Sequence, residues 1–411
     1  MTTQDTNWSG APSPVDTADI GHAPAPHGSV LDGAEFISDL LLEMSRASRR
    51  IYVKAFFYRK GPLVDKVTEM LAMRAQDGID TRLNADYYAR LITIVVEPDT
   101  SVVDAHMELT HRLYETGLKI PIVSEAVKRR FSSQQSAYSE FKKKAAERDG
   151  LFSFLSAKGV RVTFSNEPEG LRPYLPFWGR NHIKLVVIDD VAYLGGPNFD
   201  DAILNDVDFM MKITNKNVVA FLSSLFEEME NHQERNGIFP IDEENALVLD
   251  DGKSHRSVCY DYACELIKAA HDVRLMSGYL PAGQLRKALN RIYARGSCVR
   301  LIYTNPAKQG QPGVAVYNAA HKLMNRYLWR GSLGRLDHTE RVHAKLLLID
   351  DQLAYTGSHN FSLIGNYVHT AEICLATSDK CLVGNLREYY LKQYGVCQRG
   401  EKAAQSELAV Q

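Results

Sequence analysis

The sequence carries one short pattern twice, a histidine followed two residues later by a lysine and five residues after that by an aspartate. The first copy reads Arg180-Asn-His-Ile-Lys-Leu-Val-Val-Ile-Asp189 and precedes Gly195-Gly-Pro-Asn198. The second reads Arg341-Val-His-Ala-Lys-Leu-Leu-Leu-Ile-Asp350 and precedes Gly357-Ser-His-Asn360. Two copies in corresponding places indicate a duplicated folding unit, in which the two motifs build a single site.

The segments before each motif repeat the same order of helix, strand, helix and strand. Hydrophobic periodicity predicts these elements at Phe36–Ala47, Arg50–Tyr58, Leu63–Gln76 and Ile79–Ala85, and again at Tyr260–Ala270, Asp272–Tyr279, Gln284–Ala294 and Ser297–Tyr303. Helices that alternate with β-branched strands predict an α/β fold. We expect two lobes related by a pseudo-twofold axis, each with a mixed sheet flanked by helices, and the site at their interface.

Changes in composition mark the borders of the lobes. The N-terminus is rich in Pro, Thr, Ala and Gly, and the stretch around Pro240 combines a proline with an acidic run. The expected sections are a disordered tail at 1–28, an N-terminal lobe at 29–238, a linker at 239–257, a C-terminal lobe at 258–398 and a disordered tail at 399–411.

The first lobe contains an expected helical insertion at about residues 88–150. It is inferred because Arg82 and His182 are much farther apart in the sequence than their counterparts Arg300 and His343. The insertion holds two runs of basic residues among aromatic ones. Such a segment is either a solvated helix face or a basic surface that covers the site or lies on an anionic membrane.

Composition narrows the class of protein. The formal net charge of −2 gives no general attraction to nucleic acid, so binding to a polyanion would need a local basic patch. No apolar run approaches the roughly 20 residues that cross a bilayer, and the N-terminus lacks the features of a signal peptide. The six cysteines include no CxxC pair, which favours buried free thiols in a reducing compartment. We expect a cytoplasmic protein that is soluble or attached peripherally to a membrane surface.

Each motif places a histidine and a lysine on the same face of a strand. Because side chains alternate along a strand, His182 and Lys184 point the same way, and so do His343 and Lys345. A lysine inside a strand carries a desolvation cost unless an anion lies opposite it. Two such pairs therefore predict a phosphate site.

Polar residues after each motif are expected to complete this site. The glycines allow the backbone to approach a ligand closely, and nearby side chains can donate hydrogen bonds to phosphate oxygens. The expected phosphate-binding residues, besides the two lysines, are Asn198, Ser358 and Asn360.

Two acidic residues occupy matching places farther along each repeat. Asp208, with Asp206 as its alternative, and Glu372 can fix the tautomers of the histidines. We group them with the catalytic residues, together with the aspartates that end the motifs, Asp189 and Asp350. No metal or other cofactor is expected, since no set of histidines has the spacing of metal ligands.

The paired HxKxxxxD blocks with trailing GGxN and GSxN resemble the phospholipase D superfamily over nearly the whole chain after the tail. Within it, Arg180-Asn-His182, the Gly195-Gly196 pair and His343-Ala-Lys345 are most similar to bacterial cardiolipin synthases. The resemblance implies His182 as nucleophile, through a phosphohistidine, and His343 as general acid. The near-symmetry of the repeat leaves the reverse assignment open.

The resemblance also implies a substrate class. The first hypothesis is a phospholipid hydrolase or phosphatidyltransferase that works as a monomer with an internal pseudo-dimer. The alternatives are a metal-independent nuclease, less favoured by the charge, and a non-catalytic binding module. One departure from the family pattern is that five residues separate Asp189 from Gly195, whereas six separate Asp350 from Gly357, which predicts a tighter turn in the first block.

Overall fold

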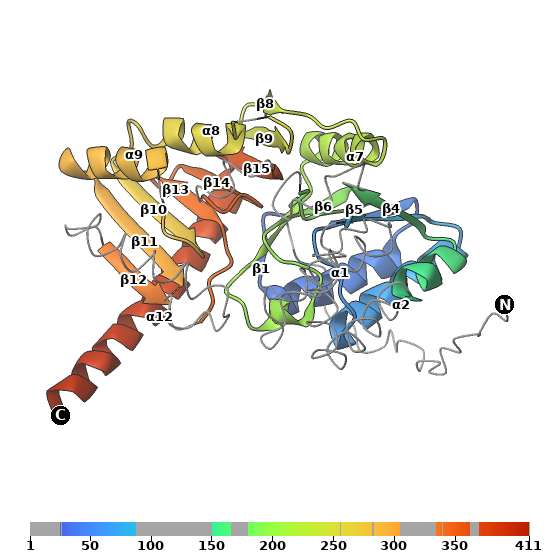
Figure 1. The fold of residues 1–411 in the computed structure, drawn as a ribbon, viewed down its shortest axis with the longest axis horizontal. Coiled ribbons are helices and arrows are strands. Elements are labelled where there is room, and N and C mark those ends of the chain that lie inside the picture. The colour runs from blue at the N-terminus through green and yellow to red at the C-terminus, as the bar shows by residue number, and fades with distance from the viewer. Residues whose placement is uncertain are drawn as a thin grey trace, which may run out of the picture.

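Two mixed β-sheets, one in each lobe, form the framework of the chain (Figure 1). The computed structural model describes residues 25, 27–87, 150–165, 180–254, 256–281, 283–304, 334–338, 340–361 and 370–410. Most of the predicted tail at 1–28 and nearly all of the predicted insertion at 88–150 lie outside the described residues.

The first sheet has seven strands in the order β1-β7-β6-β5-β2-β3-β4. Strands β2, β3 and β4 run parallel, and the other neighbours are antiparallel. The strands are β1 (Val30–Leu31), β2 (Arg50–Ala55), β3 (Asp80–Asp86), β4 (Arg161–Ser165), β5 (Leu185–Ile188), β6 (Val191–Gly195) and β7 (Met210–Ile213).

The second sheet has eight strands in the order β12-β11-β10-β13-β14-β15-β9-β8. Apart from the additional edge strand β8, it repeats the order and the strand directions of the first sheet. The strands are β8 (Gly237–Pro240), β9 (Asn245–Asp251), β10 (Asp272–Ser277), β11 (Cys298–Thr304), β12 (Gly334–His338), β13 (Leu346–Ile349), β14 (Leu353–Gly357) and β15 (Ala371–Thr377). The predicted α/β fold of two similar lobes is therefore confirmed.

Helices flank both sheets in equivalent places. Helices α1 and α2 cover the outer face of the first sheet and α8 and α9 that of the second, while α7 and α12 contribute to the core between the sheets. Their bounds are α1 (Gly33–Arg46), α2 (Pro62–Gln76), α7 (Lys216–Glu230), α8 (Val258–Leu266), α9 (Gly283–Ala294) and α12 (Lys380–Val410). A short 3₁₀ helix, η3 (Asp201–Leu204), follows β6. Among the described residues, no helix is both long and apolar enough to span a bilayer.

Local signals in the sequence set several helix starts. Asp32 begins α1 with a capping box, because its carboxylate accepts from the amides of Ala34 and Glu35 while Glu35 accepts from the amide of Asp32. Asn215 caps α7 and Ser257 caps α8 in a similar way, each through its side-chain oxygen. These caps fix where the helices leave the sheets.

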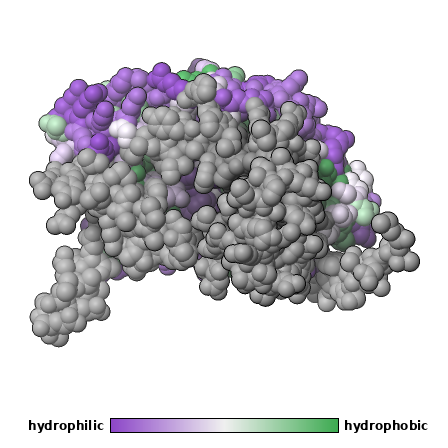
Figure 2. All heavy atoms as spheres, viewed as in Figure 1, coloured by the Kyte–Doolittle hydropathy of each residue, from purple (hydrophilic) through white to green (hydrophobic). Residues whose placement is uncertain are grey.

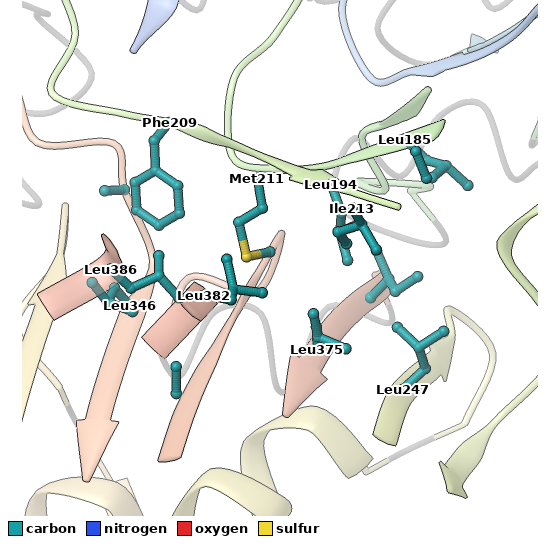
Figure 3. Packing of buried hydrophobic residues seen from close by; sticks show 14 of the residues in the cluster. Leu185, Leu194, Phe209, Met211, Ile213, Leu247, Leu346, Leu375, Leu382 and Leu386 are labelled. Atoms are coloured by element: carbon teal, nitrogen blue, oxygen red, sulfur yellow. The ribbon is translucent and has the colours of Figure 1, made fainter. Parts of the chain in front are cut away.

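One hydrophobic cluster joins the two lobes. Figure 3 shows side chains from β5, β6 and β7 of the first lobe opposite side chains from β9, β13, β15 and α12 of the second. The labelled residues are Leu185, Leu194, Phe209, Met211 and Ile213 on one side and Leu247, Leu346, Leu375, Leu382 and Leu386 on the other. Because this apolar surface is shared, the lobes hold each other in one fixed arrangement. The described surface over α7, α8 and α9, at the top of Figure 2, is mostly hydrophilic.

Two predicted boundaries need correction. The expected linker at 239–257 contains the end of β8 and all of β9, which pairs with β15 through seven residues. The expected disordered tail at 399–411 instead continues α12 to Val410, and Figure 1 shows this end of the helix extending away from the lobe. Pro240 sits at the end of an edge strand, where a missing amide is tolerated, so it does not mark a linker.

The two motifs differ by one residue in the distance from aspartate to glycine, and this difference lies in the turn between the two strands. Two residues connect β5 to β6, and three connect β13 to β14. Leu185 pairs with Leu194 and Leu346 pairs with Thr356, so Gly195 and Gly357 both directly follow the partner of the equivalent leucine. The first turn is tighter, as predicted. Gly195 and Gly357 therefore occupy equivalent positions in the two sheets.

Candidate active site

Short bridges between the lobes bring the two motifs together. Residues Asn181 and Ala371 form one parallel bridge, and Val207 and Val342 form its pseudo-symmetric counterpart. The amide of His182 donates to the carbonyl of Ala371 at 2.9 Å, and the amide of His343 donates to that of Val207 at 2.9 Å. Each motif histidine is thus tied by its backbone to the opposite lobe.

The side chain of His182 pairs with a carboxylate from the second lobe. Its Nδ1 lies 3.1 Å from Oε2 of Glu372 and 3.1 Å from the carbonyl oxygen of Ser358. A carbonyl oxygen can only accept, so Nδ1 carries the proton and donates. This tautomer leaves a lone pair on Nε2, the atom that can attack an electrophile.

The side chain of His343 makes the reciprocal contact with the first lobe. Its Nδ1 lies 2.5 Å from Oδ2 of Asp208. Gly196 allows this approach, because a Cβ at that position would lie 2.4 Å from Oδ1 of Asp208. Each histidine is therefore held by a carboxylate of the other lobe. Glu372 holds His182, and Asp208 holds His343.

Asp206, the alternative to Asp208, has a different partner. Its carboxylate accepts two hydrogen bonds from the guanidinium of Arg341, with 2.7 Å between Nε and Oδ1. This ion pair also joins the two lobes. Arg341 lies two residues before His343 in the sequence, and Asp206 lies two residues before Asp208. It leaves Asp208 as the acid that holds the histidine.

The two motif lysines are buried beside the histidines. Lys184 is 0 % exposed and Lys345 is 1 % exposed. The amine of Lys184 donates to the carbonyl of His182 at 2.8 Å, and that of Lys345 donates to the carbonyl of His343. Within the described part of the chain, no carboxylate forms an ion pair with either amine. Burial lowers the pKa of both amines, and that of Lys184 falls well below its usual value. An anion between the two amines would favour their charged forms.

Burial and the lysine charges set the protonation of the histidines. Burial lowers the pKa of His182 to about 4, and the charges of Lys184 and Lys345 act in the same direction. The pKa of His343 falls well below its usual value for the same reasons. The amine of Lys345 lies 3.0 Å from Nδ1 of His343. Both imidazoles are neutral near pH 7.

The carboxylates respond differently to their surroundings. Burial opposes ionisation of Glu372, but the effects of His182, His359 and Lys184 together outweigh burial and lower its pKa to about 2. Burial raises the pKa of Asp208, against the opposing charges of Lys345 and Lys184. Glu372 is therefore ionised near neutral pH and accepts a hydrogen bond from Nδ1–H of His182.

The side chains predicted to donate hydrogen bonds to a phosphate have different surroundings. Within the described residues, Oδ1 of Asn198 is buried without a hydrogen-bond partner. Asn360 follows the equivalent glycine in the second lobe, and its backbone carbonyl accepts from Ser277 at 3.0 Å. Ser358 differs from the prediction, because its hydroxyl donates to Glu372 and accepts from the amide of Ile373 at 3.0 Å. Ser358 supports the carboxylate behind His182.

The aspartates that end the motifs accept hydrogen bonds from backbone amides. Asp189 lies at the end of β5 opposite to His182, where its carboxylate accepts from the amides of residues 48–50 at 2.7–3.0 Å. Asp350 lies in the equivalent place after β13 and accepts from the amides of His271 and Asp272. Each aspartate anchors the start of a neighbouring strand, β2 or β10. Both aspartates lie at the end of a motif strand that is far from the histidine.

Several residues beside the first motif were not predicted from the sequence. Phe56 packs its ring against the imidazole, with 5.0 Å between centroids and 70° between planes. Asp86 accepts from the amide of Asn181 at 2.5 Å. Lys54 is fully buried and donates to Asn84 and Ser165. Lys54 lies among apolar residues of a strand, as the motif lysines do. This pattern in the sequence could have identified it as a buried lysine.

Comparisons with known proteins give related sequences. The family model described as "Cardiolipin synthase, PLD-like domain" matches residues 262–393. The chain is 27 % identical over 234 residues to cardiolipin synthase B of Salmonella typhi, covering 52 % of this chain and 55 % of that protein. It is 28 % identical over 220 residues to the minor cardiolipin synthase ClsB of Bacillus subtilis, covering 49 % and 53 %. The chain spans about half the length of the curated relatives it matches.

A solved structure shares the fold of both lobes. The phosphatidylserine synthase of Haemophilus influenzae superposes with a TM-score of 0.59 at 13 % identity and covers 92 % of this chain and 93 % of that chain. At this identity the likeness concerns the fold alone. The chain is thus similar to phospholipase D-like proteins in its two histidine motifs and in a family model over residues 262–393, and it shares the fold of this solved structure.

Proposed function

We propose that the chain is a phospholipase D-type enzyme that transfers phosphatidyl groups of phospholipids from one alcohol to another. The observation that carries this proposal is the crosswise pairing of His182 with Glu372 and of His343 with Asp208, around two buried lysines. The matched relatives are named as cardiolipin synthases, which supports a phospholipid as substrate.

The first half-reaction forms a covalent intermediate. A phosphodiester resists nucleophiles because of its negative charge, so Lys184 and Lys345 bind its non-bridging oxygens and offset that charge. Nε2 of His182 attacks phosphorus, the bond to the headgroup oxygen breaks, and the electron pair leaves with that oxygen. His343, which takes up a proton when the anion enters, gives this proton to the departing alcohol.

The second half-reaction returns the enzyme to its starting state. A second alcohol gives its proton to His343 while its oxygen attacks phosphorus, and the electron pair of the P–N bond returns to His182. When phosphatidylglycerol is both the donor and the acceptor, the products of the full cycle are cardiolipin and glycerol. When the acceptor is water, the product is phosphatidic acid.

The test is incubation of the purified protein with vesicles that contain phosphatidylglycerol, phosphatidylethanolamine and phosphatidylcholine, with and without EDTA, followed by mass spectrometry of the lipids. We expect cardiolipin or another transfer product in both conditions. His182→Ala and His343→Ala should each remove nearly all turnover, since residues that act as a unit are not additive.

A matched control is His271→Ala, because His271 is exposed on the loop before β10. This variant should keep wild-type turnover. If the wild-type protein leaves all three lipids intact and instead cleaves single-stranded DNA in EDTA, the lipid proposal is wrong and the nuclease reading replaces it.

A further inference from the structure

The residue before each motif histidine is held by a side chain of its own lobe. The amide of Asn181 donates to Oδ2 of Asp86 at 2.5 Å. The amide of Val342 donates to Oγ1 of Thr304 at 2.8 Å, and the hydroxyl of Thr304 donates to the carbonyl oxygen of Val342 at 3.1 Å. All four residues are buried. Each histidine therefore follows a residue whose main chain is fixed by a buried polar side chain.

Asp86 and Thr304 occupy equivalent positions of the repeat. Asp86 is the last residue of β3 and Thr304 the last of β11, and both strands are seven residues long. Each strand pairs in parallel over six residues with the strand beside the motif, β2 in the first lobe and β10 in the second. The repeat therefore keeps this hydrogen bond while its acceptor changes from a carboxylate to a hydroxyl, which indicates that the contact itself is needed at both motifs.

A second difference between the lobes accompanies this change of acceptor. Lys54 of β2 lies opposite Asn84, two residues before Asp86. Burial lowers the pKa of Lys54, and the charge of Asp86 acts in the opposite direction. The equivalent of Lys54 in the second lobe is Met276, which has no charge. Because a buried carboxylate is costly without an opposite charge nearby, the charged acceptor occurs together with the lysine and the neutral acceptor with the methionine.

Three consecutive amides around His182 have fixed acceptors. That of Asn181 donates to Asp86, as described above. That of His182 donates to the carbonyl of Ala371 in the other lobe at 2.9 Å, and that of Ile183 donates to Oδ1 of Asn181 at 3.2 Å. The main chain of the first motif is thus held from two sides, by its own sheet through Asp86 and by the opposite lobe through Ala371.

The second motif has a similar arrangement. The amides of His343 and Ala344 both donate to the carbonyl of Val207 in the first lobe, each at 2.9 Å. Thr304 holds the residue before them on the side of its own sheet. In both motifs the carboxylate at Nδ1 fixes the orientation of the imidazole ring, whereas these backbone contacts fix where the ring is attached.

The place where each ring is attached decides how far it lies from phosphorus. Reacting atoms must approach to about 3–3.5 Å, and a displacement of about 1 Å can lower a rate on the order of 100-fold. A ring on a displaced main chain would leave the two lysines free to bind the anion but would lie too far from phosphorus. Loss of either contact should therefore affect the transition state more than it affects anion binding.

We infer that Asp86 and Thr304 are positioning residues, which set the distance of the two motif histidines from phosphorus through hydrogen bonds to the residue before each histidine. This inference rests on the proposed function, since it requires both histidines to act on a phosphodiester. It extends the machinery of that site to the ends of β3 and β11, and both residues act through the main chain of the motif.

The test compares turnover with anion binding in matched variants of Asp86. Turnover of bis-p-nitrophenyl phosphate and of phosphatidylglycerol vesicles is measured per folded molecule, and calorimetry gives the binding of dimethyl phosphate. We expect Asp86→Ala to lower kcat about 100-fold on both substrates, while the binding of dimethyl phosphate stays within about twofold of wild type. Asp86→Asn keeps an oxygen acceptor of the same size and should retain kcat within about fivefold.

The second lobe gives an independent pair of variants. Thr304→Val keeps the shape of the side chain without its hydroxyl and should lower kcat at least about tenfold. Thr304→Ser keeps the hydroxyl and should retain kcat within about threefold. The control is Thr81→Val at the other end of β3 from Asp86, where a buried hydroxyl donates to the carbonyl of Ile79 at 3.0 Å. This change should lower stability and leave kcat per folded molecule unchanged.

Normal kcat per folded molecule in Asp86→Ala or Thr304→Val, equal losses in Asp86→Ala and Asp86→Asn, or an equal loss in Thr81→Val would overturn the inference. If Asp86→Ala does not fold, the two Thr304 variants decide the question. Turnover of bis-p-nitrophenyl phosphate without turnover of any lipid would overturn the proposed function and leave this inference standing. A wild-type protein that acts on neither substrate would overturn both.

Discussion

Oδ2 of Asp208, in the first lobe, lies 2.5 Å from Nδ1 of His343, in the second. The pseudo-symmetric contact between Glu372 and His182 crosses the interface in the opposite direction. Neither lobe therefore holds a complete histidine–carboxylate pair. The site exists only when the two lobes are packed, and the hydrophobic cluster between the sheets keeps it assembled.

The crossed carboxylates should control turnover through the histidine tautomers. We expect Asp208→Asn and Glu372→Gln each to lower kcat by at least about 100-fold, because an amide no longer selects the Nδ1–H form of its histidine. The measurement is lipid turnover at saturating substrate. The control is Asp206→Asn, which alters the neighbouring ion pair with Arg341 and should cost only a few-fold in rate. Equal losses in all three variants would contradict this role.

The aspartates at the ends of the motifs should affect stability and not chemistry. Asp189→Ala removes the acceptor for the amides of residues 48–50, and Asp350→Ala does the same for His271 and Asp272. We expect each change to lower the free energy of unfolding by about 1.5–3 kcal/mol, since the amides lose hydrogen bonds to a charged acceptor. Turnover per folded molecule should stay within about twofold of the wild-type value.

Urea denaturation and initial rates on the same samples separate these two effects. Asp190→Ala is the matched control, because Asp190 adjoins Asp189 but its side chain is 76 % exposed. It should change neither quantity. A well-folded Asp350→Ala protein with normal stability and no turnover would restore a catalytic role for this aspartate.

Lys54 should make stability depend on pH above neutrality. Burial lowers its pKa to about 7 in the folded protein, against the opposing charge of Asp86, whereas the unfolded chain keeps the usual value near 10.5. Between these values the unfolded state binds more protons, so stability rises with pH. The stability of the wild type relative to Lys54→Met should therefore increase by about 2 kcal/mol from pH 7 to pH 9.

Urea unfolding of both proteins at the two pH values gives this difference directly. Methionine is the matched replacement, because Met276 occupies the equivalent position in the second lobe. Groups that titrate in both proteins cancel in the comparison. A gap that stays constant or shrinks with rising pH would show that Lys54 is charged in the folded state throughout this range.

Anion binding should be coupled to proton uptake at His343. Burial and the charges of Lys345 and Lys184 lower the pKa of this histidine, so it is neutral at pH 7 without a ligand. A phosphodiester anion between the lysines offsets those charges and favours the imidazolium. Dimethyl phosphate, whose single charge is constant from pH 5 to 8, should bind more tightly as pH falls, by up to about tenfold per pH unit.

Calorimetry in buffers with different heats of ionisation counts the protons taken up. We expect a net uptake approaching one proton per bound anion near pH 7, and its loss in His343→Ala. His271→Ala, which alters an exposed histidine, should retain the uptake. Binding of equal strength at pH 5 and pH 8, without proton uptake, would refute the coupling.

Local patterns were sufficient to predict the architecture. The alternation around His182 and His343 identified two buried strands, and the repeated order of helices and strands predicted two similar lobes with mixed sheets. The same local reasoning misjudged β9 and the end of α12. An acidic run and a proline suggested a linker, but pairing of β9 with β15, more than a hundred residues away in the chain, stabilises it as a strand.

The sequence by itself determined the chemical groups of the site, two histidines and two lysines on strands, because residue identity and side-chain alternation are local properties. Only the tertiary structure decided which carboxylate serves which histidine, that Asp189 and Asp350 anchor strands, and that Phe56 packs against His182. The physical reason is that each of these facts depends on contacts between segments far apart in the chain. Such contacts are selected by the packing of the two lobes as a whole.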